Sequence, residues 1–218
     1  MESADKIPDA GDFWEQHYEQ RPRIWSGQPN ARLIQFAATL PPGHALDLGC
    51  GEGADAVWLA EQGWQVTAVD ISSVALGRAQ AAAVERGVAD RIAFHRHNLT
   101  ETFPAGAFDL VSAQFLQSPL DFPRESVLRA AAEAVAPGGW LLIVEHGESP
   151  PWSGLRHHHH MHFPTPQETL AALDLDATWT SEHVGRLERE ATGPEGESGH
   201  LIDNVLLLKR GHKGAHLP

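Results

Sequence analysis

Short apolar runs along this chain alternate with longer stretches of helical periodicity. Buried strands are predicted where runs rich in Val, Ile, Leu, Phe and Ala have strand length, at 44–49, 64–70, 91–97, 107–114 and 139–146. Apolar positions three or four apart predict helices over 53–63, 73–87 and 124–135. Strands that alternate with helices pair in parallel through right-handed crossovers. The pattern therefore predicts an α/β fold built on a doubly wound, mostly parallel sheet.

Both ends of the chain add elements to this sheet. Two helices precede the first strand, over 12–20 and 31–40, and Asp12 is the predicted N-cap of the first. The chain closes with two strand-like runs, 177–189 and 200–210, joined by a hydrophilic loop. Such a pair is typical of a hairpin, which we place at the edge of the sheet.

A further helix is predicted over 165–173, where the start signals are strong. Thr165 is a suitable N-cap, Pro166 suits the first helical position, and Glu168 can return a hydrogen bond to the cap. The preceding segment, 147–164, is rich in Pro, Gly and His and is therefore expected to be a loop.

Length and composition favour one domain of 218 residues. We expect a helical N-terminal arm at 1–40, a main domain at 41–210 and a loose tail at 211–218. The formal net charge of −13 argues against nucleic acid or an anionic membrane as a partner. The chain has one cysteine, no apolar leader and no run long enough to span a membrane. These features predict a cytoplasmic protein that acts on a small molecule, and they leave the oligomeric state open.

The segment "LDLGCGEG" is the strongest motif, because it joins a predicted strand to a predicted helix. Glycines there allow a ligand to approach the backbone and the helix N-terminus. The motif also fits the weak dinucleotide fingerprint. Three polar residues at strand ends favour another ligand: Asp47 would repel a pyrophosphate but suit a cation, Asp70 can accept ribose hydroxyls, and Asn98 can bond an adenine edge.

With these motifs, the chain resembles the class I S-adenosylmethionine-dependent methyltransferases. "ALDLGCGEG", "VTAVDIS", "RHNLTETFPAGAFDLV" and "VAPGGWLLIVE" are similar to successive family motifs, and Asn98 stands where the family usually has Asp. "FWEQHYEQRPRIWSGQPN" resembles the arm of the tellurite-resistance and thiopurine methyltransferase branch. The resemblance implies a seven-stranded sheet with an antiparallel last strand.

The same resemblance implies S-adenosylmethionine as cofactor and assigns residues to its parts. Asp47, Gly49 and Gly51 would face the methionine moiety, and Asp70 the ribose. The adenine would lie against Ile71, Asn98 and Leu99, and Trp25 of the arm would cover the cofactor. Cys50 is expected to be a small packing residue.

Methyl transfer from a sulfonium is a displacement in which the protein supplies alignment and electrostatics. The ligand should lie beyond the carboxyl ends of the strands, which carry Gln114 and His146. Gln114 is a candidate for orienting the acceptor or the cofactor, and His146 for catalysis. The acceptor is expected to be a small molecule with a sulfur, metalloid, oxygen or nitrogen nucleophile. "SAQFLQSP" lacks the signature of methyltransferases that act on nucleobases.

The stretch "RHHHHMHFPTP" lies inside the loop 147–164, which should overhang the cofactor. In an extended segment His158, His160 and His162 share one side, so they can bind Zn, Ni, Cu or Fe. Two other interpretations stay open: one histidine acts as a general base, or the loop is only solvated. Two rival functions also stay open, an NAD(P)-dependent oxidoreductase and a non-catalytic metal-binding or regulatory module on the same fold.

Overall fold

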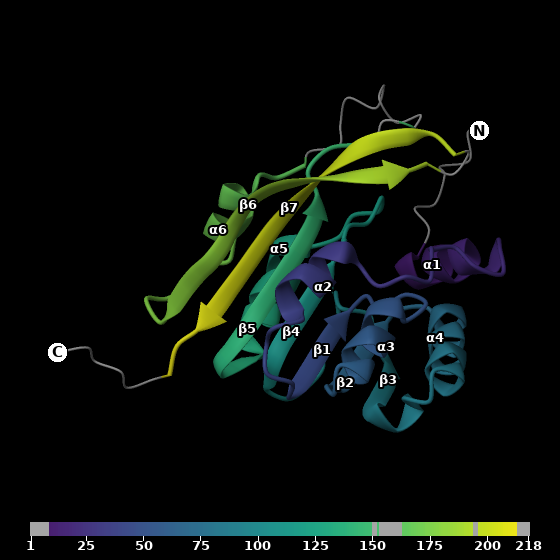
Figure 1. Ribbon diagram of the computed structural model, residues 1–218, viewed down its shortest axis with the longest axis horizontal. Helices are drawn as coiled ribbons and strands as arrows, with labels where there is room; N and C mark the ends of the chain where they lie inside the picture. Colours follow the sequence, from purple (N-terminus) through teal and green to yellow (C-terminus); the bar gives the residue numbers. More distant parts are fainter. Residues whose placement is uncertain (1–8, 150–151, 153–162, 194–195, 213–218) are drawn as a thin grey trace, which may run out of the picture.

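A seven-stranded sheet forms the centre of the protein, in the order β3-β2-β1-β4-β5-β7-β6 (Figure 1). The computed structural model describes residues 9–149, 152, 163–193 and 196–212. The strands are β1 (His44–Leu48), β2 (Gln65–Asp70), β3 (Ile92–Arg96), β4 (Phe108–Gln114), β5 (Val135–His146), β6 (Trp179–Thr192) and β7 (Ser198–Arg210). All neighbouring pairs among the first five strands are parallel, and β7 runs antiparallel to β5. The predicted doubly wound sheet and its antiparallel last strand are confirmed.

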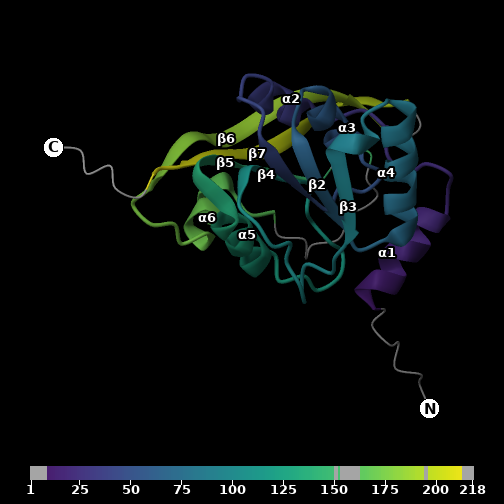
Figure 2. The same ribbon diagram turned by 90° about the horizontal axis from the view of Figure 1, so that it is seen from below.

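Helices cover both faces of the sheet (Figure 2). They are α1 (Ala10–Glu19), α2 (Ala31–Ala37), α3 (Ala54–Glu61), α4 (Ser73–Glu85), α5 (Arg124–Glu133) and α6 (Pro166–Ala172), with a short 3₁₀ turn at Ala89–Arg91. α2, α3 and α4 pack on one face, and α5 and α6 on the other. No helix in the described ranges has the length and apolar character needed to cross a membrane.

Alternate residues of each strand feed two separate cores. In β1, Ala45 packs with Leu33 of α2, whereas Leu46 and Leu48 pack with Leu128 of α5. Burying one such leucine contributes about 1.5–3 kcal/mol. Because both faces are covered at the centre of the sheet, β1, β4 and β5 are mostly apolar, whereas the edge strand β6 is largely polar and exposed.

The β6–β7 hairpin continues past the end of β5. The last β5–β7 pair is His146 with Asp203, but β6 and β7 remain paired as far as Thr192 with Ser198. Figure 1 shows the hairpin extending beyond the tip of β5 on the side where α1 lies. It therefore forms a wall above the carboxyl edge of the sheet.

The structure corrects several predicted boundaries, among them the end of α2 at Ala37 in place of residue 40 and the start of β5 at Val135 in place of residue 139. The N-cap of α1 is Asp9, whose Oδ1 accepts hydrogen bonds from Gly11 N and Asp12 N, so the Asp12 prediction was wrong. α5 ends at Glu133 because Val135 already pairs with Phe108 as the start of β5. The predicted start of α6 is confirmed, including the reciprocal bonds between Thr165 and Glu168.

Candidate active site at the carboxyl edge of the sheet

The loop 49–53, here called the glycine loop, connects β1 to α3. Gly49 and Gly51 have φ values of +65° and +53°, which side chains rarely adopt. A Cβ on Gly51 would lie 2.9 Å from the Tyr18 hydroxyl, and one on Gly49 would lie 2.7 Å from Leu116 Cδ1. The loop backbone is therefore bordered closely by α1 and by the segment after β4.

Asp70, the last residue of β2, orders the glycine loop. Its Oδ2 accepts a hydrogen bond from Gly51 N and its Oδ1 one from Ser72 N, each at 2.9 Å. Burial raises the pKa of the Asp70 carboxyl, although these backbone hydrogen bonds oppose the shift. A carboxylate has about four lone-pair sites, so Asp70 can still accept bonds from a ligand.

Asp47 is a buried carboxylate on β1, 1% exposed. Its Oδ2 has no hydrogen-bond partner among the described residues. Burial raises its pKa well above the usual range, and the nearby Asp55 and Asp70 raise it further. A buried ionised group without a partner is costly, so a cationic group placed here would stabilise the site.

Two acidic residues tie the arm to the glycine loop. Glu52 accepts hydrogen bonds from Ile24 N at 3.1 Å and from Trp25 N at 3.0 Å, and it pairs with Arg78 at 2.8 Å. Asp55, on the first turn of α3, is buried and bonded to the arm through the loop before α2. Sequence reasoning missed both, although acidic residues at the start of a helix after a glycine loop were a usable signal.

Trp25 lies beside the glycine loop, and its predicted role of covering the cofactor stays a prediction. Its Nε1 donates a hydrogen bond to the Tyr18 hydroxyl at 3.1 Å, and its indole is 51% exposed. Both rings border Gly51. Burial, reinforced by Asp70, raises the pKa of Tyr18, which keeps the hydroxyl neutral.

The residues predicted to face adenine follow β2 and β3, so they lie at one edge of the sheet. Asn98 Oδ1 accepts hydrogen bonds from Thr100 N and Oγ1, which shapes the turn after β3. Its Nδ2 makes no hydrogen bond within the described part of the chain and is available as a donor. Ile71 is half-buried, and Leu99 packs against the core on the α5–α6 face.

Gln114 and His146 end the adjacent strands β4 and β5. Gln114 is 8% exposed; its Nε2 donates to Ser112 Oγ at 3.1 Å, while its Oε1 has no partner in the ranges described. The His146 ring stacks on Phe115 with centroids 4.4 Å apart. Burial lowers the pKa of His146, Arg189 lowers it too, and Asp203 opposes. A neutral imidazole suits a general base.

The proposed metal ligands cannot be placed, because His158, His160 and His162 lie outside the described residues. Within the described part of the chain, no group of three or more His, Cys, Asp or Glu residues is arranged to hold a metal ion. Cys50 packs against the core on the α3 face, and burial raises the pKa of its thiol well above the usual range. It is therefore a packing residue and not a thiolate nucleophile, as predicted.

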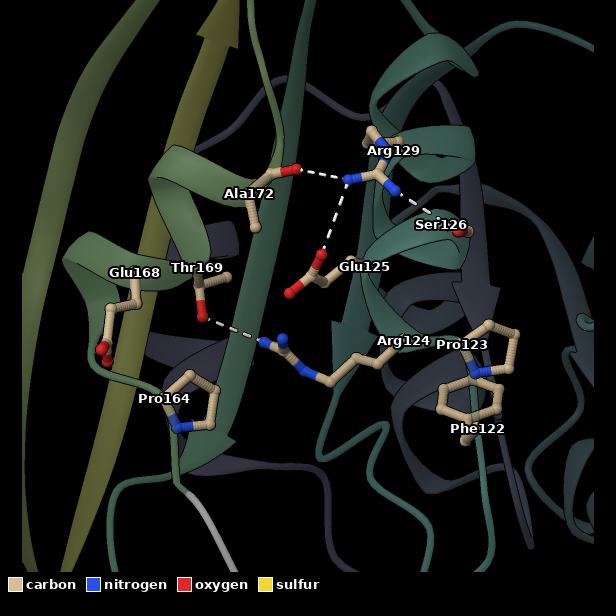
Figure 3. Close-up of a pocket in the computed structure, with 10 residues that line it drawn as sticks. All are labelled: Phe122, Pro123, Arg124, Glu125, Ser126, Arg129, Pro164, Glu168, Thr169 and Ala172. Carbon is tan, nitrogen blue, oxygen red and sulfur yellow. Dashed lines mark hydrogen bonds and ion pairs between the residues drawn. The ribbon is translucent and has the colours of Figure 1, made fainter.

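Two hollows flank this edge. The larger, about 610 Å³, lies between α5 and α6, where Arg124 donates to Thr169 Oγ1 at 3.0 Å (Figure 3). Arg124 also pairs with the buried Glu145. Its lining residues come from these helices and the turns before them. The smaller, about 200 Å³, is lined by the arm, Phe115 and the β6–β7 hairpin. Only the smaller of these two touches the arm, which also borders the glycine loop.

The glycine loop suits a cationic nucleoside better than a pyrophosphate. Asp47, Asp55 and Asp70 supply buried acceptors. The nearby Arg78 is occupied by Glu52 and by the Tyr18 carbonyl oxygen, at 2.8 Å each. This set of carboxylate acceptors therefore fits the sulfonium, ammonium and ribose groups of S-adenosylmethionine.

Comparisons with known proteins agree with this chemistry. A family model described as a methyltransferase domain matches residues 17–175. The ubiquinone biosynthesis O-methyltransferase of Chromobacterium violaceum is 33% identical over 132 residues, which span 60% of this chain and 56% of that protein. The match thus covers little more than half the length of that relative.

Solved structures share the fold. One, which concerns the conversion of a disulfide bond into a thioacetal group during echinomycin biosynthesis, has a TM-score of 0.70 at 22% identity and covers 94% of each chain. TehB from Haemophilus influenzae has a TM-score of 0.65 at 17% identity, covering 92% of this chain and 66% of that one. By family match, fold and site, the chain belongs to the methyltransferase domain family, with the class I S-adenosylmethionine-dependent methyltransferase fold.

Proposed function

We propose that the protein transfers a methyl group from S-adenosylmethionine to a small-molecule acceptor. The observation that carries this proposal is the Asp47 carboxylate, which is buried beside the glycine loop with one oxygen unpartnered among the described residues. A sulfonium cofactor brings positive charge to this position, whereas NAD(P) brings phosphate. Asp70 on the next strand supplies the ribose acceptor that the cofactor also needs.

The chain's own residues hold and align the reactants. Asp47 and the backbone of Gly49 and Gly51 bind the methionine end, and Asp70 binds the ribose hydroxyls. Ile71, Asn98 and Leu99 form the adenine side, and Trp25 closes over the loop. When bound, S-adenosylmethionine supplies an electrophilic methyl group.

On the acceptor side, Gln114 and His146 lie at the ends of neighbouring strands. We propose that Gln114 orients the acceptor. A ring nitrogen of neutral His146 then takes up the proton that the acceptor loses. Among the sulfur, metalloid, oxygen and nitrogen acceptors, oxygen is favoured by the O-methyltransferase relative. The acidic charge of the chain supports a small molecule over nucleic acid, and the single cysteine supports a cytoplasmic location.

The His-rich loop remains a proposal of its own. We propose that His158, His160 and His162 bind a transition metal or supply a base, since histidine clusters do both, and a loop that is only solvated is the third interpretation. Metal binding is tested by metal analysis of tag-free protein purified without a nickel column. Turnover is measured on the same protein before and after chelation. Loss of turnover on chelation supports it, and full turnover without metal contradicts it.

Isothermal titration calorimetry tests the cofactor. Wild-type protein should bind S-adenosylhomocysteine in the nanomolar-to-micromolar range that a preorganised site allows, and it should not respond to NADPH. Asp70→Ala should abolish binding, whereas Asp90→Ala, at an exposed position, should not. Circular dichroism checks the fold, because Asp70 also holds Gly51 and Ser72.

The rival functions predict other results. NADPH binding without S-adenosylhomocysteine binding would establish an oxidoreductase. Tight metal binding with no transfer to thiols, phenols or amines would establish a regulatory module.

A further inference from the structure

The smaller hollow lies where three parts of the fold meet at the carboxyl edge. It is lined by Ser26, Gln28, Pro29, Asn30, Ala31 and Arg32 of the arm, by Phe115 after β4, and by Arg189 and Asp203 of the hairpin. Phe115 directly follows Gln114, and Asp203 is paired with His146 in the sheet. The hollow therefore lies next to the strand ends that carry the two residues proposed to act on the acceptor, although neither of these side chains lines it.

Asp203 contributes a buried carboxylate to this hollow. Its side chain is 0% exposed. Oδ2 accepts hydrogen bonds from Arg32 Nε at 3.0 Å and from Arg189 Nε at 2.8 Å. Oδ1, by contrast, has no partner in the part of the chain that the structure describes. A buried carboxylate oxygen without a donor is unfavourable, so a ligand that donates a hydrogen bond gains affinity here.

The charge of the cluster decides what kind of donor fits. Arg32 and Arg189 carry two positive charges and Asp203 one negative charge, so the cluster has a net positive charge. An ammonium group would meet this excess positive charge in a poorly hydrated place, where the repulsion is strong. A hydroxyl donates the same hydrogen bond without that repulsion.

Planar side-chain groups, the Phe115 ring and the Arg189 guanidinium, form another part of the lining of the hollow. The guanidinium carbon of Arg189 lies 6.0 Å from the centroid of the Phe115 ring, which also stacks on His146. Phe115 has a φ of +52°, which is rare for a non-glycine residue, and its N–H is bonded to Val144 O at 2.7 Å. Strained conformations of this kind are retained at binding sites, where the surrounding structure holds them in place. A planar, aromatic ligand matches these surfaces.

We propose that this hollow binds the methyl acceptor, as an aromatic ring that bears a hydroxyl group. The hydroxyl donates to Asp203 Oδ1, and the ring packs against Phe115 and the guanidinium of Arg189. Asp203 is then a specificity residue, because it selects a neutral donor over an ether or a cation. This assignment rests on the proposed methyl transfer, since it places an acceptor beside Gln114 and His146.

Ligand-observed NMR titrations on the wild-type protein test the assignment without a mutation. The probes are phenol, methoxybenzene and benzylamine, each added with and without saturating S-adenosylhomocysteine. Phenol should bind about tenfold more tightly than methoxybenzene, because only phenol satisfies the buried oxygen. Benzylamine should bind most weakly. Equal binding of phenol and methoxybenzene, or tightest binding of benzylamine, would overturn the assignment.

Variants then locate the effect. Asp203→Asn places a donor amide where the acceptor stood, so the preference for phenol over methoxybenzene should fall from about tenfold to about one. Asp90→Asn, at an exposed site, is the matched control and should keep the preference. If Asp203→Asn does not fold, Phe115→Leu is tested in its place. This variant should lower the affinities for phenol and for methoxybenzene by a similar factor. An unchanged preference in Asp203→Asn, or unchanged affinities in Phe115→Leu, would show that the probes bind elsewhere.

The cofactor result separates the two proposals. Calorimetry of S-adenosylhomocysteine should give the same affinity in the wild type and both hollow variants. If the wild type does not bind S-adenosylhomocysteine, the proposed function fails, while the phenol preference is still measured on the protein alone. If it binds and phenol shows no preference, only the acceptor assignment fails.

Discussion

Asn30 holds Asp55 through two hydrogen bonds, from its backbone N–H at 2.7 Å and from its side-chain amide at 2.6 Å. Asn30 precedes α2, and Asp55 lies on the first turn of α3, so the pair joins the arm to the helix that follows the glycine loop. The glycine loop and the arm are consequently held together by direct hydrogen bonds, although 25 residues separate Asn30 from Asp55 in the sequence.

Asn30→Ala removes the side-chain half of this connection. The Asn30 side chain makes no capping bond in α2, so the substitution leaves the helix start intact. Hydrogen bonds to charged groups contribute roughly 1.5–3 kcal/mol, and the free energy of unfolding in urea should fall by about that much. Affinity for S-adenosylhomocysteine should fall with it. Gln20→Ala, on the exposed end of α1, is the control and should change neither; an unchanged Asn30→Ala would show that the arm is held by other contacts.

Glu52→Gln should expose the arm to trypsin. Glu52 accepts the Ile24 N–H, which belongs to the peptide bond that trypsin cuts after Arg23. Loss of the carboxylate weakens this bond and the ion pair with Arg78, so the arm opens more often and cleavage accelerates. Mass spectrometry of a digestion time course measures the rate. The control variant Glu19→Gln, at an exposed position, should be cut at the wild-type rate. Equal cleavage rates in the two variants would show that Glu52 does not hold the arm.

Two glycine substitutions should have opposite effects. Gly51→Ala forces a side chain into a φ of +53° and to within 2.9 Å of the Tyr18 hydroxyl, so cofactor binding should be lost. Gly77→Ala lies inside α4, where an added Cβ meets nothing within 4 Å. It should raise the free energy of unfolding by about 0.5–1 kcal/mol without changing cofactor affinity. Calorimetry measures cofactor affinity, and urea unfolding measures stability. Cofactor binding by Gly51→Ala would show that position 51 tolerates a Cβ beside the Tyr18 hydroxyl.

Asp47 gives the stability an inverse dependence on pH. Burial raises its folded-state pKa above the usual 3.8, so the folded protein holds a proton that the unfolded chain releases. The contribution of protonated Asp47 to the free energy of unfolding is therefore fully present below about pH 4. It is lost as the pH rises through the raised pKa of the folded state. Asp47→Asn should unfold at higher urea concentration than wild type, by a margin that grows from pH 4.5 to pH 8. It should bind S-adenosylmethionine more weakly, and parallel pH curves for the two proteins would reject this explanation.

The strand segments and their parallel pairing could be predicted because they depend on local patterns. The strand order β3-β2-β1-β4-β5-β7-β6 was not predicted. The central strands are short, mostly apolar runs covered on both faces. The proposed site residues Asp47, Asp70 and Asn98 lie at or just after strand ends, which parallel pairing brings to one edge. The α5–β5 boundary was missed because it is set by a tertiary pairing of Val135 with Phe108. Propensity does not contain that information.

The polar connections of the arm were missed for a related reason. Glu52 with Ile24 and Asn30 with Asp55 join segments 25 or more residues apart, and nothing in either segment marks its partner. The pairing of Asp203 with two arginines likewise depends on the hairpin register. Charged residues of this kind look like solvated surface until the fold brings them together.

The position of β7 sets the order in which the molecule can be assembled on the ribosome. β7 lies between β5 and β6 in the sheet, so β5 has no neighbour on that side until 198–210 have been synthesised. Before then, the backbone N–H and C=O groups along this edge of β5 are open to pairing with other chains, and β6 lacks its native partner. The wall of the acceptor hollow forms in the same late event, which means that the protein completes its sheet and its proposed substrate pocket together.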